Sequence, residues 1–135
     1  MTSDPLVLGN LLDTHAILWT VATPHLLSDA AYKAIACGPN FLSVVSYWEV
    51  AIKSMKGKID VGDVSRWWTE AVKITVATPV LLRPAHVDAL QSLPPIHKDP
   101  FDRMLIAQAM TERLTLVSMD PEIARYASDA WSVIG

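Results

Sequence analysis

The chain has 135 residues, which suits one domain with its own hydrophobic core. Its 11 Lys and Arg against 14 Asp and Glu give a formal net charge of −3, so charge neither favours nor excludes a nucleic-acid substrate. One cysteine, Cys37, rules out an internal disulfide framework, and without a signal-peptide pattern or a membrane-span pattern we expect a cytoplasmic protein with no membrane association.

Short apolar runs and helical patterns alternate along the first half of the chain. An apolar run over residues 6–12 predicts a buried strand, and a helix begins at residues 15–19 and is limited by Pro24. Ser28 is a favoured N-cap for a helix over Asp29–Cys37. The further predictions for this half are a buried strand over 41–45, a helix over 46–55 and a helix over 62–73.

The same alternation continues to the end of the chain. The predicted elements are a weak strand over 79–82, a short helix over Pro84–Leu90, the clearest helix over Pro100–Glu112, a strand over 114–119, a helix over 121–126 and a last strand over 131–134. This order predicts a single α/β domain over residues 1–135, with a central, mostly parallel, twisted sheet flanked by helices on both faces. Such strands are buried on both sides, which accounts for an apolar content of 51%.

Four carboxylates stand at junctions between these elements. Asp13 and Asp120 follow predicted strands directly, and Glu49 follows a strand by a short connection. Because ligands of open parallel sheets bind outside the carboxyl ends of the strands, we expect these three to share one edge of the sheet. Asp102 is the fourth carboxylate, near the start of the clearest helix.

Each of these acids also has an ordinary structural interpretation. Asp is a favoured N-cap, so Asp13, Asp99 and Asp120 can each begin a helix. Asp102 is then the third residue of the helix that Asp99 caps, as in a capping box. Ser46 and Glu49 spell a capping box, S-x-x-E. For any one of them alone, capping is the favoured interpretation.

Helical spacing favours a site for two of the acids. Asp102 and Glu49 each share a helical face with apolar residues, namely Leu105, Ile106, Ala109 and Met110 for Asp102, and Val45, Trp48, Ile52 and Met55 for Glu49. A carboxylate on a buried face is costly unless it is paired or binds a metal. Carboxylate oxygens without cysteine favour Mg²⁺ or Mn²⁺ over zinc, so the four acids predict a divalent-metal site that acts on phosphate.

Four segments together match a known family. They are LLDTHAILW, SVVSYWEVAIKSMKGKI, LPPIHKDPFDRMLIAQAM and LTLVSMDPEIARY, and they span residues 11–126. On these motifs the chain resembles PIN-domain ribonucleases, and specifically the VapC toxins of prokaryotic toxin–antitoxin pairs. The resemblance implies a PIN-like fold and an endoribonuclease that uses Mg²⁺ or Mn²⁺ to cleave structured RNA, such as transfer or ribosomal RNA, and thereby inhibits translation.

The resemblance also assigns roles to individual residues and partners. Carried over by motif, the catalytic and metal-binding quartet is Asp13, Glu49, Asp102 and Asp120. Asp99 belongs to the same motif and is a candidate additional ligand, with N-capping as its equal alternative. The expected partners are an RNA substrate and a VapB-type antitoxin, in a homodimer or in a hetero-oligomer with the antitoxin.

Accessory residues surround the quartet in the sequence. Thr14 and Ser118 are candidates for orienting a ligand, and both are equally well explained as hydroxyls at helix starts. Arg103 is expected to contact substrate phosphate or to pair with Asp99.

A small basic patch is predicted after Glu49. Lys53 lies four residues after Glu49, so it forms either an i,i+4 ion pair or a phosphate contact beside the metal. With Lys56 and Lys58 it makes a patch suited to RNA, although the helix dipole also favours lysine at this position.

The aromatic and histidine residues carry weaker predictions. Trp19 and Trp67 more often belong to a core or a partner surface than to a base-stacking site, and their helices are the predicted antitoxin groove. His97 is expected in a loop near the cleft, and no pair of histidines has the spacing of zinc ligands.

Two other classes of protein were weighed. A signalling receiver domain needs paired acids after its first strand and a lysine after its last, whereas Asp13 stands alone and Met119-Asp120 replaces the lysine. A catalytically inactive PIN-like module that binds RNA or protein is the remaining alternative, and the intact quartet argues against it.

Overall fold

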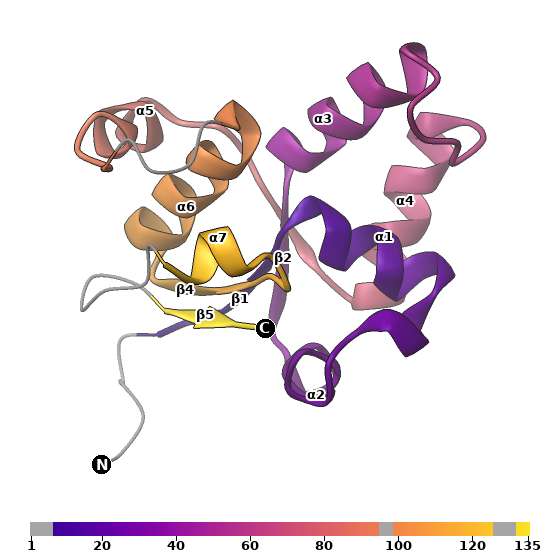
Figure 1. Cartoon of the computed structure of the whole chain (residues 1–135), viewed down its shortest axis with the longest axis horizontal. Helices are drawn as coiled ribbons and strands as arrows, with labels where there is room; N and C mark the ends of the chain where they lie inside the picture. The colour runs from indigo at the N-terminus through magenta and orange to yellow at the C-terminus, as the bar shows by residue number, and fades with distance from the viewer. Residues whose placement is uncertain (1–6, 95–98, 126–131) are drawn as a thin grey trace.

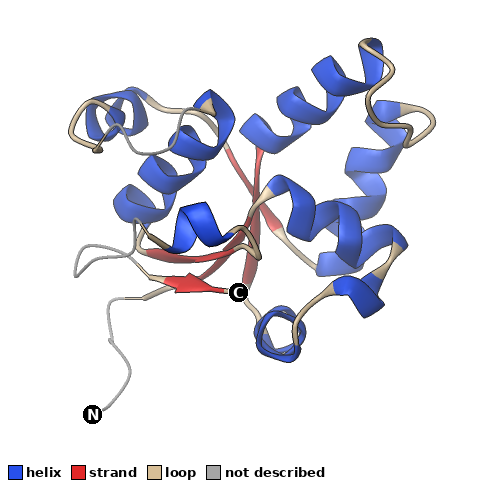
Figure 2. Cartoon of the chain, viewed as in Figure 1, coloured by secondary structure: helices blue, strands red, loops and turns tan. Residues whose placement is uncertain are grey.

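The computed structural model describes residues 7–94, 99–125 and 132–135. Within these ranges one sheet runs through the molecule in the order β3-β2-β1-β4-β5, and every strand pair is parallel. Its strands are β1 (Gly9–Leu12), β2 (Asn40–Ser43), β3 (Thr78–Val80), β4 (Leu114–Val117) and β5 (Val133–Ile134). The predicted α/β class and parallel sheet are confirmed, and Figure 2 shows the strands in red between two groups of helices.

Helices cover both faces of the sheet. They are α1 (Thr14–Ala22), α2 (Asp29–Cys37), α3 (Val44–Met55), α4 (Val64–Thr75), α5 (Pro84–Leu90), α6 (Pro100–Glu112) and α7 (Pro121–Ala124), with a short 3₁₀ helix over Pro24–Leu26. In Figure 1, α1 and α4 lie on one side of the strands and α5 and α6 on the other.

Alternate side chains of the two central strands build two separate cores. Leu11 and Leu116 belong to the core beneath α5, α6 and α7, whereas Leu12 and Val117 belong to the core beneath α1, α2 and α4. All four side chains are fully buried. Because these strands are buried on both faces, the sheet accounts for part of the high apolar content.

Helix boundaries agree with the sequence where a cap is unambiguous. The bounds of α2, α5 and α6 are as predicted, and Ser28 accepts the N–H of Ala31 at 3.0 Å. The β2/α3 boundary was predicted wrongly, because Ser43 caps α3 by accepting the N–H of Val45 at 3.0 Å. Helix α3 therefore starts two residues before Ser46, and the expected capping box is absent from this position.

Other boundaries of helices and strands differ from the predicted ones by about two residues. Helix α4 begins at Val64, not at residue 62, because Asp63 caps it by accepting the N–H of Arg66. Strand β4 ends at Val117, two residues before its predicted end. The predicted ends at residues 6, 126 and 131 lie outside the described residues. No helix in the described part of the chain is long and apolar enough to cross a membrane.

Candidate active site

Asp13 and Asp120 lie at the carboxyl ends of neighbouring strands. Leu12 pairs with Val117 across β1 and β4, and the N–H of Asp13 donates to the carbonyl of Val117 at 3.0 Å. Asp13 caps α1 by accepting the N–H of Ala16 at 2.8 Å, and Asp120 caps α7. The two acids therefore cap their helices and also lie at the same edge of the sheet, because both helices start where the strands end.

The start of α6 brings Asp99 and Asp102 to the same edge. Asp99 accepts the N–H groups of Phe101 and Asp102 at 2.8 and 3.1 Å, so the predicted N-cap is confirmed. The Phe101 ring meets the Trp48 ring edge to face, with centroids 5.0 Å apart. This contact joins α6 to α3 one residue away from Asp102 and Glu49, and it places those two acids on adjoining helices.

Five carboxylates line one pocket of about 460 Å³ at this edge. The lining residues are Asp13, His15, Trp19, Glu49, Lys53, Asp99, Asp102, Met119, Asp120 and Pro121. Asp13 and Glu49 are buried, at 4% and 2% exposure, and the other three acids are partly buried. All five acids of the predicted site thus surround a single hollow.

Glu49 is held by two neighbours, one on each oxygen. The Thr14 hydroxyl donates to Oε1 at 2.6 Å, and the Lys53 ammonium lies 2.6 Å from Oε2. Ser46 Oγ lies 3.0 Å from the Thr14 hydroxyl and completes this group. These contacts satisfy a carboxylate that would otherwise be buried at high cost.

Asp13 is coupled to Asp120 through Ser118. Burial raises the pKa of the Asp13 carboxyl, and the negative charge of Asp120 adds to this. Hydrogen bonds from Ser118 and Ala16 and the nearby His15 oppose the rise without cancelling it. Since the Ser118 oxygen also accepts the N–H of Asp120 at 3.1 Å, this hydroxyl touches both acids.

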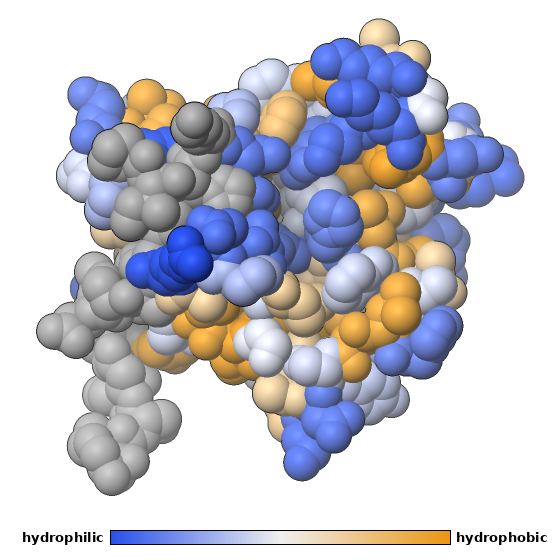
Figure 3. Space-filling model, in the orientation of Figure 1, coloured by the Kyte–Doolittle hydropathy of each residue, from blue (hydrophilic) through white to orange (hydrophobic). Residues whose placement is uncertain are grey.

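Lys53 lines the pocket and brings a positive charge close to these acids. Its hydrogen bond to Glu49 raises the pKa of the ammonium, burial opposes this, and the charges of Asp99 and Asp102 add to the rise. The i,i+4 ion pair predicted from the sequence is confirmed. Lys56 and Lys58 are exposed beyond the end of α3, where Figure 3 shows hydrophilic residues gathered.

Arg103 also makes contacts that were not predicted from the sequence. Its guanidinium donates to the carbonyl of Pro94 at 2.7 Å and lies 3.5 Å from that of Leu93, and Arg103 does not line the acidic pocket. These contacts tie Leu93 and Pro94 to α6. The prediction for His97 falls outside the described residues.

Of the two helical faces predicted to be buried, one is confirmed and the other is only partly buried. The face that carries Asp102 is confirmed, because Leu105, Ile106 and Ala109 are buried. The face that carries Glu49 is wrong in part, since Trp48 is 57% and Met55 87% exposed. Trp67 is 6% exposed and belongs to the core, as predicted.

Residues of α1 were missed as parts of the site. His15 and Trp19 line the pocket, and their rings contact each other at a centroid distance of 6.2 Å. They are four residues apart and therefore share one face of the helix that Asp13 caps. This i,i+4 spacing was the signal available in the sequence.

The donor set fits a hard divalent cation. It is made of carboxylate oxygens without sulfur, which is the preference of Mg²⁺ and Mn²⁺. In the described ranges, no three His, Cys, Asp or Glu side chains are grouped so that they could hold one ion as they stand. The positive charge beside Glu49 in this arrangement is the ammonium of Lys53, which contacts one of its two oxygens.

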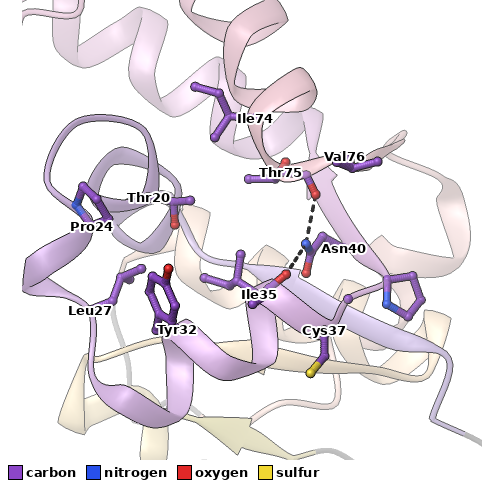
Figure 4. Close-up of a pocket in the computed structure, with 13 residues that line it drawn as sticks. Thr20, Pro24, Leu27, Tyr32, Ile35, Cys37, Asn40, Ile74, Thr75 and Val76 are labelled. Carbon is purple, nitrogen blue, oxygen red and sulfur yellow. Dashed lines mark hydrogen bonds between the residues drawn. The ribbon is translucent and has the colours of Figure 1, made fainter.

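A larger hollow, of about 570 Å³, lies at the opposite, amino edge of the sheet. Figure 4 shows the Asn40 amide at its floor, donating to the carbonyls of Ile35 and Thr75 at 2.8 and 2.9 Å. Its lining in the described residues holds neither carboxylate nor histidine. The volume of a pocket alone therefore does not identify the functional site. The acidic pocket is the candidate active site because of its carboxylates.

Comparison with known proteins agrees with this architecture. A family model described as the PIN domain matches residues 11–129, and the chain belongs to the PIN-domain family. A comparison with curated proteins returned no match.

Solved structures share the fold at low sequence identity. One is the crystal structure of VapBC2 from Rickettsia felis bound to a DNA fragment from their promoter, with a TM-score of 0.66, 12% identity, and coverage of 93% of this chain and 96% of that one. Another is a toxin–antitoxin complex from Klebsiella pneumoniae, with a TM-score of 0.61, 16% identity and the same coverages of 93% and 96%. At these identities the likeness is one of fold.

Proposed function

We propose that this protein is a Mg²⁺- or Mn²⁺-dependent endoribonuclease, the VapC-type toxin of a toxin–antitoxin pair, which cleaves structured RNA and thereby inhibits translation. The observation that carries the proposal is the group of five carboxylates around one pocket at the carboxyl edge of a PIN-domain sheet. Such an edge is where parallel sheets bind their ligands.

In this proposal each carboxylate has a stated task. Asp13, Glu49, Asp102 and Asp120 hold the cation, and Asp99 caps α6 and serves as an additional ligand. A divalent ion at such a site lowers the pKa of a bound water and offsets negative charge on a phosphodiester.

Neighbouring side chains keep the acids in place. Thr14 orients Glu49, and Ser118 orients Asp13 while it fixes the backbone of Asp120. Lys53 is the side chain of the pocket that contacts substrate phosphate. Arg103 acts indirectly, by holding Pro94 against α6.

Cleavage of RNA by the purified protein tests the proposal. Asp13→Asn and Asp102→Asn should each lower the rate at least about a hundredfold, because they remove a charged ligand directly. Asp63→Asn is the matched control, since Asp63 caps α4 away from the pocket and asparagine keeps the cap. EDTA should stop cleavage and Mn²⁺ should restore it.

Undiminished cleavage by the two Asn variants contradicts the site assignment. RNA binding without cleavage by the parent protein supports the alternative, an inactive PIN-like binding module.

The partner is proposed from the solved structures of similar fold, one described as VapBC2 bound to a DNA fragment and the other as a toxin–antitoxin complex. We propose a VapB-type antitoxin, and a homodimer or antitoxin complex acting in the cytoplasm. A small reading frame immediately upstream, encoding a DNA-binding N-terminus, is the expected genetic sign. Co-expression of the two products should restore growth that the toxin alone stops, and should give a complex on gel filtration.

A further inference from the structure

The Lys53 ammonium occupies one of the two oxygens of Glu49 in the acidic pocket. We propose that Lys53 is a built-in counter-ion, which competes with the divalent cation for Glu49 and leaves that carboxylate when the cation binds. This inference rests on the proposed metal site and concerns how that site is loaded. It assigns Lys53 a positioning role before any substrate arrives.

A divalent cation and the Lys53 ammonium would both contact the carboxylate of Glu49. Lys53 Nζ lies 2.6 Å from Oε2, and the Thr14 hydroxyl lies 2.6 Å from Oε1. Both oxygens therefore already have a close partner. Thr14 is itself buried, at 2% exposure, and cannot easily turn away. A divalent cation that binds Glu49 through Oε2 lies close to the ammonium, and the repulsion between the two positive charges favours departure of the ammonium.

Lysine is the partner that can move. The Lys53 side chain is 31% exposed, whereas the Glu49 side chain is 3% exposed and enclosed by α1 and α3. A lysine has a long flexible stem and its ammonium is readily hydrated, so it reaches water without disturbing the helix. Glu49 has no such route. The exchange therefore takes place at Lys53 and leaves the carboxylate in position.

The surrounding charge explains why a counter-ion is needed. Asp13, Asp99, Asp102 and Asp120 line the same pocket as Glu49. Like charges held close together destabilise one another unless a positive charge is added or protons are taken up. Lys53 supplies a positive charge to the site when no divalent cation is bound. Separating Lys53 from Glu49 costs free energy, and this cost reduces the free energy of binding of the divalent cation. Affinity for the ion is lowered accordingly.

An ordinary helical ion pair is the competing explanation. An exposed i,i+4 pair contributes only a few tenths of a kcal/mol and would not alter the binding of an ion measurably. This pair differs because its acid is buried and faces a pocket of further acids. The two explanations predict different ion affinities when Lys53 loses its charge.

Titration of the purified full chain with Mn²⁺ alone, by calorimetry and by thermal shift, separates them. Lys53→Met keeps the length of the side chain and removes its charge, so half-saturation should need roughly three- to tenfold less Mn²⁺. Lys56→Met makes the same charge change at an exposed residue at the end of the same helix. It should stay within about twofold of the parent, because exposed charges are screened by salt. Lys53→Arg keeps the charge and should bind Mn²⁺ as weakly as the parent does.

Stability gives a second readout that requires no RNA. In EDTA, Lys53→Met should unfold at a lower temperature than the parent, because Glu49 is left buried without its counter-ion. Saturating Mn²⁺ should narrow this difference, since the ion replaces the missing charge. If Lys53→Met fails to fold, Lys53→Gln carries the same test with a polar side chain.

Each outcome decides the matter. Equal or weaker Mn²⁺ binding by the neutral variants overturns the counter-ion role and leaves the proposed metal site standing. An effect of the same size in Lys56→Met also overturns it, since it would show a general effect of charge. A flat titration for the parent protein overturns the metal site and the counter-ion role together.

Discussion

Asp13 caps a helix and borders the acidic pocket with the same side chain. Its carboxylate accepts the N–H of Ala16, and burial raises its pKa above the ordinary value of 3.8. An acid whose pKa is raised by folding binds its proton more readily in the folded state, so stability falls as pH rises through this range. The penalty is present at neutral pH and disappears below the ordinary pKa.

Asp13→Asn should therefore stabilise the cation-free protein at neutral pH. Asparagine keeps an oxygen for the cap and removes the buried charge. Urea unfolding in EDTA should show a higher free energy of unfolding than the parent at pH 7.5, and the gain should shrink towards pH 4. A variant that is less stable than the parent at pH 7.5 would show that burial is not what raises this pKa.

Thr14 holds a buried acid by one hydrogen bond, and the loss of that bond should be measurable. Thr14→Val keeps the shape and leaves Oε1 of Glu49 without its donor, at a cost of about 1–3 kcal/mol in unfolding free energy. Thr14→Ser keeps the hydroxyl and should recover most of this stability in the same denaturation measurement. If serine is as destabilising as valine, the methyl group of Thr14 contributes as much as the hydroxyl, and the hydrogen bond is not the main contribution of this side chain.

At the scale of elements, α5 is fastened to α6 through a buried histidine. His86 is fully buried, its Nδ1 accepts the N–H of Arg83 at 3.0 Å, and its Nε2 lies 2.6 Å from Glu112. Because Nδ1 is an acceptor, the proton is on Nε2 and donates to Glu112. Burial tends to raise the pKa of Glu112, but hydrogen bonds from Arg83 and His86 outweigh it and lower the pKa.

Glu112→Ala should loosen this connection by about 1–3 kcal/mol, since it leaves the buried N–H of His86 without an acceptor. Glu122→Ala is the control, because Glu122 is exposed and its ion pair is with Arg125, an exposed residue three positions along the chain. Its effect should be within about 0.5 kcal/mol. Because the pKa of Glu112 is lowered by folding, the parent should lose this stabilisation as pH falls through the acid range. Chemical denaturation between pH 7 and pH 3 measures both effects.

The elements that were predicted well are those whose signals are local. Ser28 and Asp99 each precede a clear helical pattern, and the structure confirms both caps. The start of α3 was missed because strand and helix follow without a turn, and Ser43 and Ser46 are equally good caps on paper. Only the packing of β2 in the sheet decides between them, and that is not encoded in neighbouring residues.

In the candidate site, too, local signals were predictable and tertiary contacts were not. Asp13 and Asp120 follow from the rule about strand ends, and the Glu49–Lys53 pair follows from helical spacing. The placement of Arg103 on the carbonyl of Pro94 depends on a loop conformation that spacing does not give. Contacts within one element were predictable, whereas contacts from an element to a loop were not.

At the scale of the whole molecule, parallel topology explains why helix caps and a site coincide. In the described part of the chain every strand pair is parallel, so β1, β2 and β4 end at one edge and the helices after them begin there. Acids suited to the starts of helices are thereby collected from distant parts of the sequence. The buried interior on both faces of the sheet supports this edge.

The central claim is that these collected acids bind a divalent cation together. Anomalous diffraction from crystals of the protein grown with Mn²⁺ tests it most directly. The account predicts an ion in the acidic pocket, with carboxylate oxygens of Asp13, Glu49, Asp102 and Asp120 at coordination distance, about 2.0–2.1 Å for an ion of the Mg²⁺ type, and with Lys53 turned away from Glu49. A crystal saturated with Mn²⁺ in which this pocket stays empty, or in which the ion lies elsewhere, would contradict it.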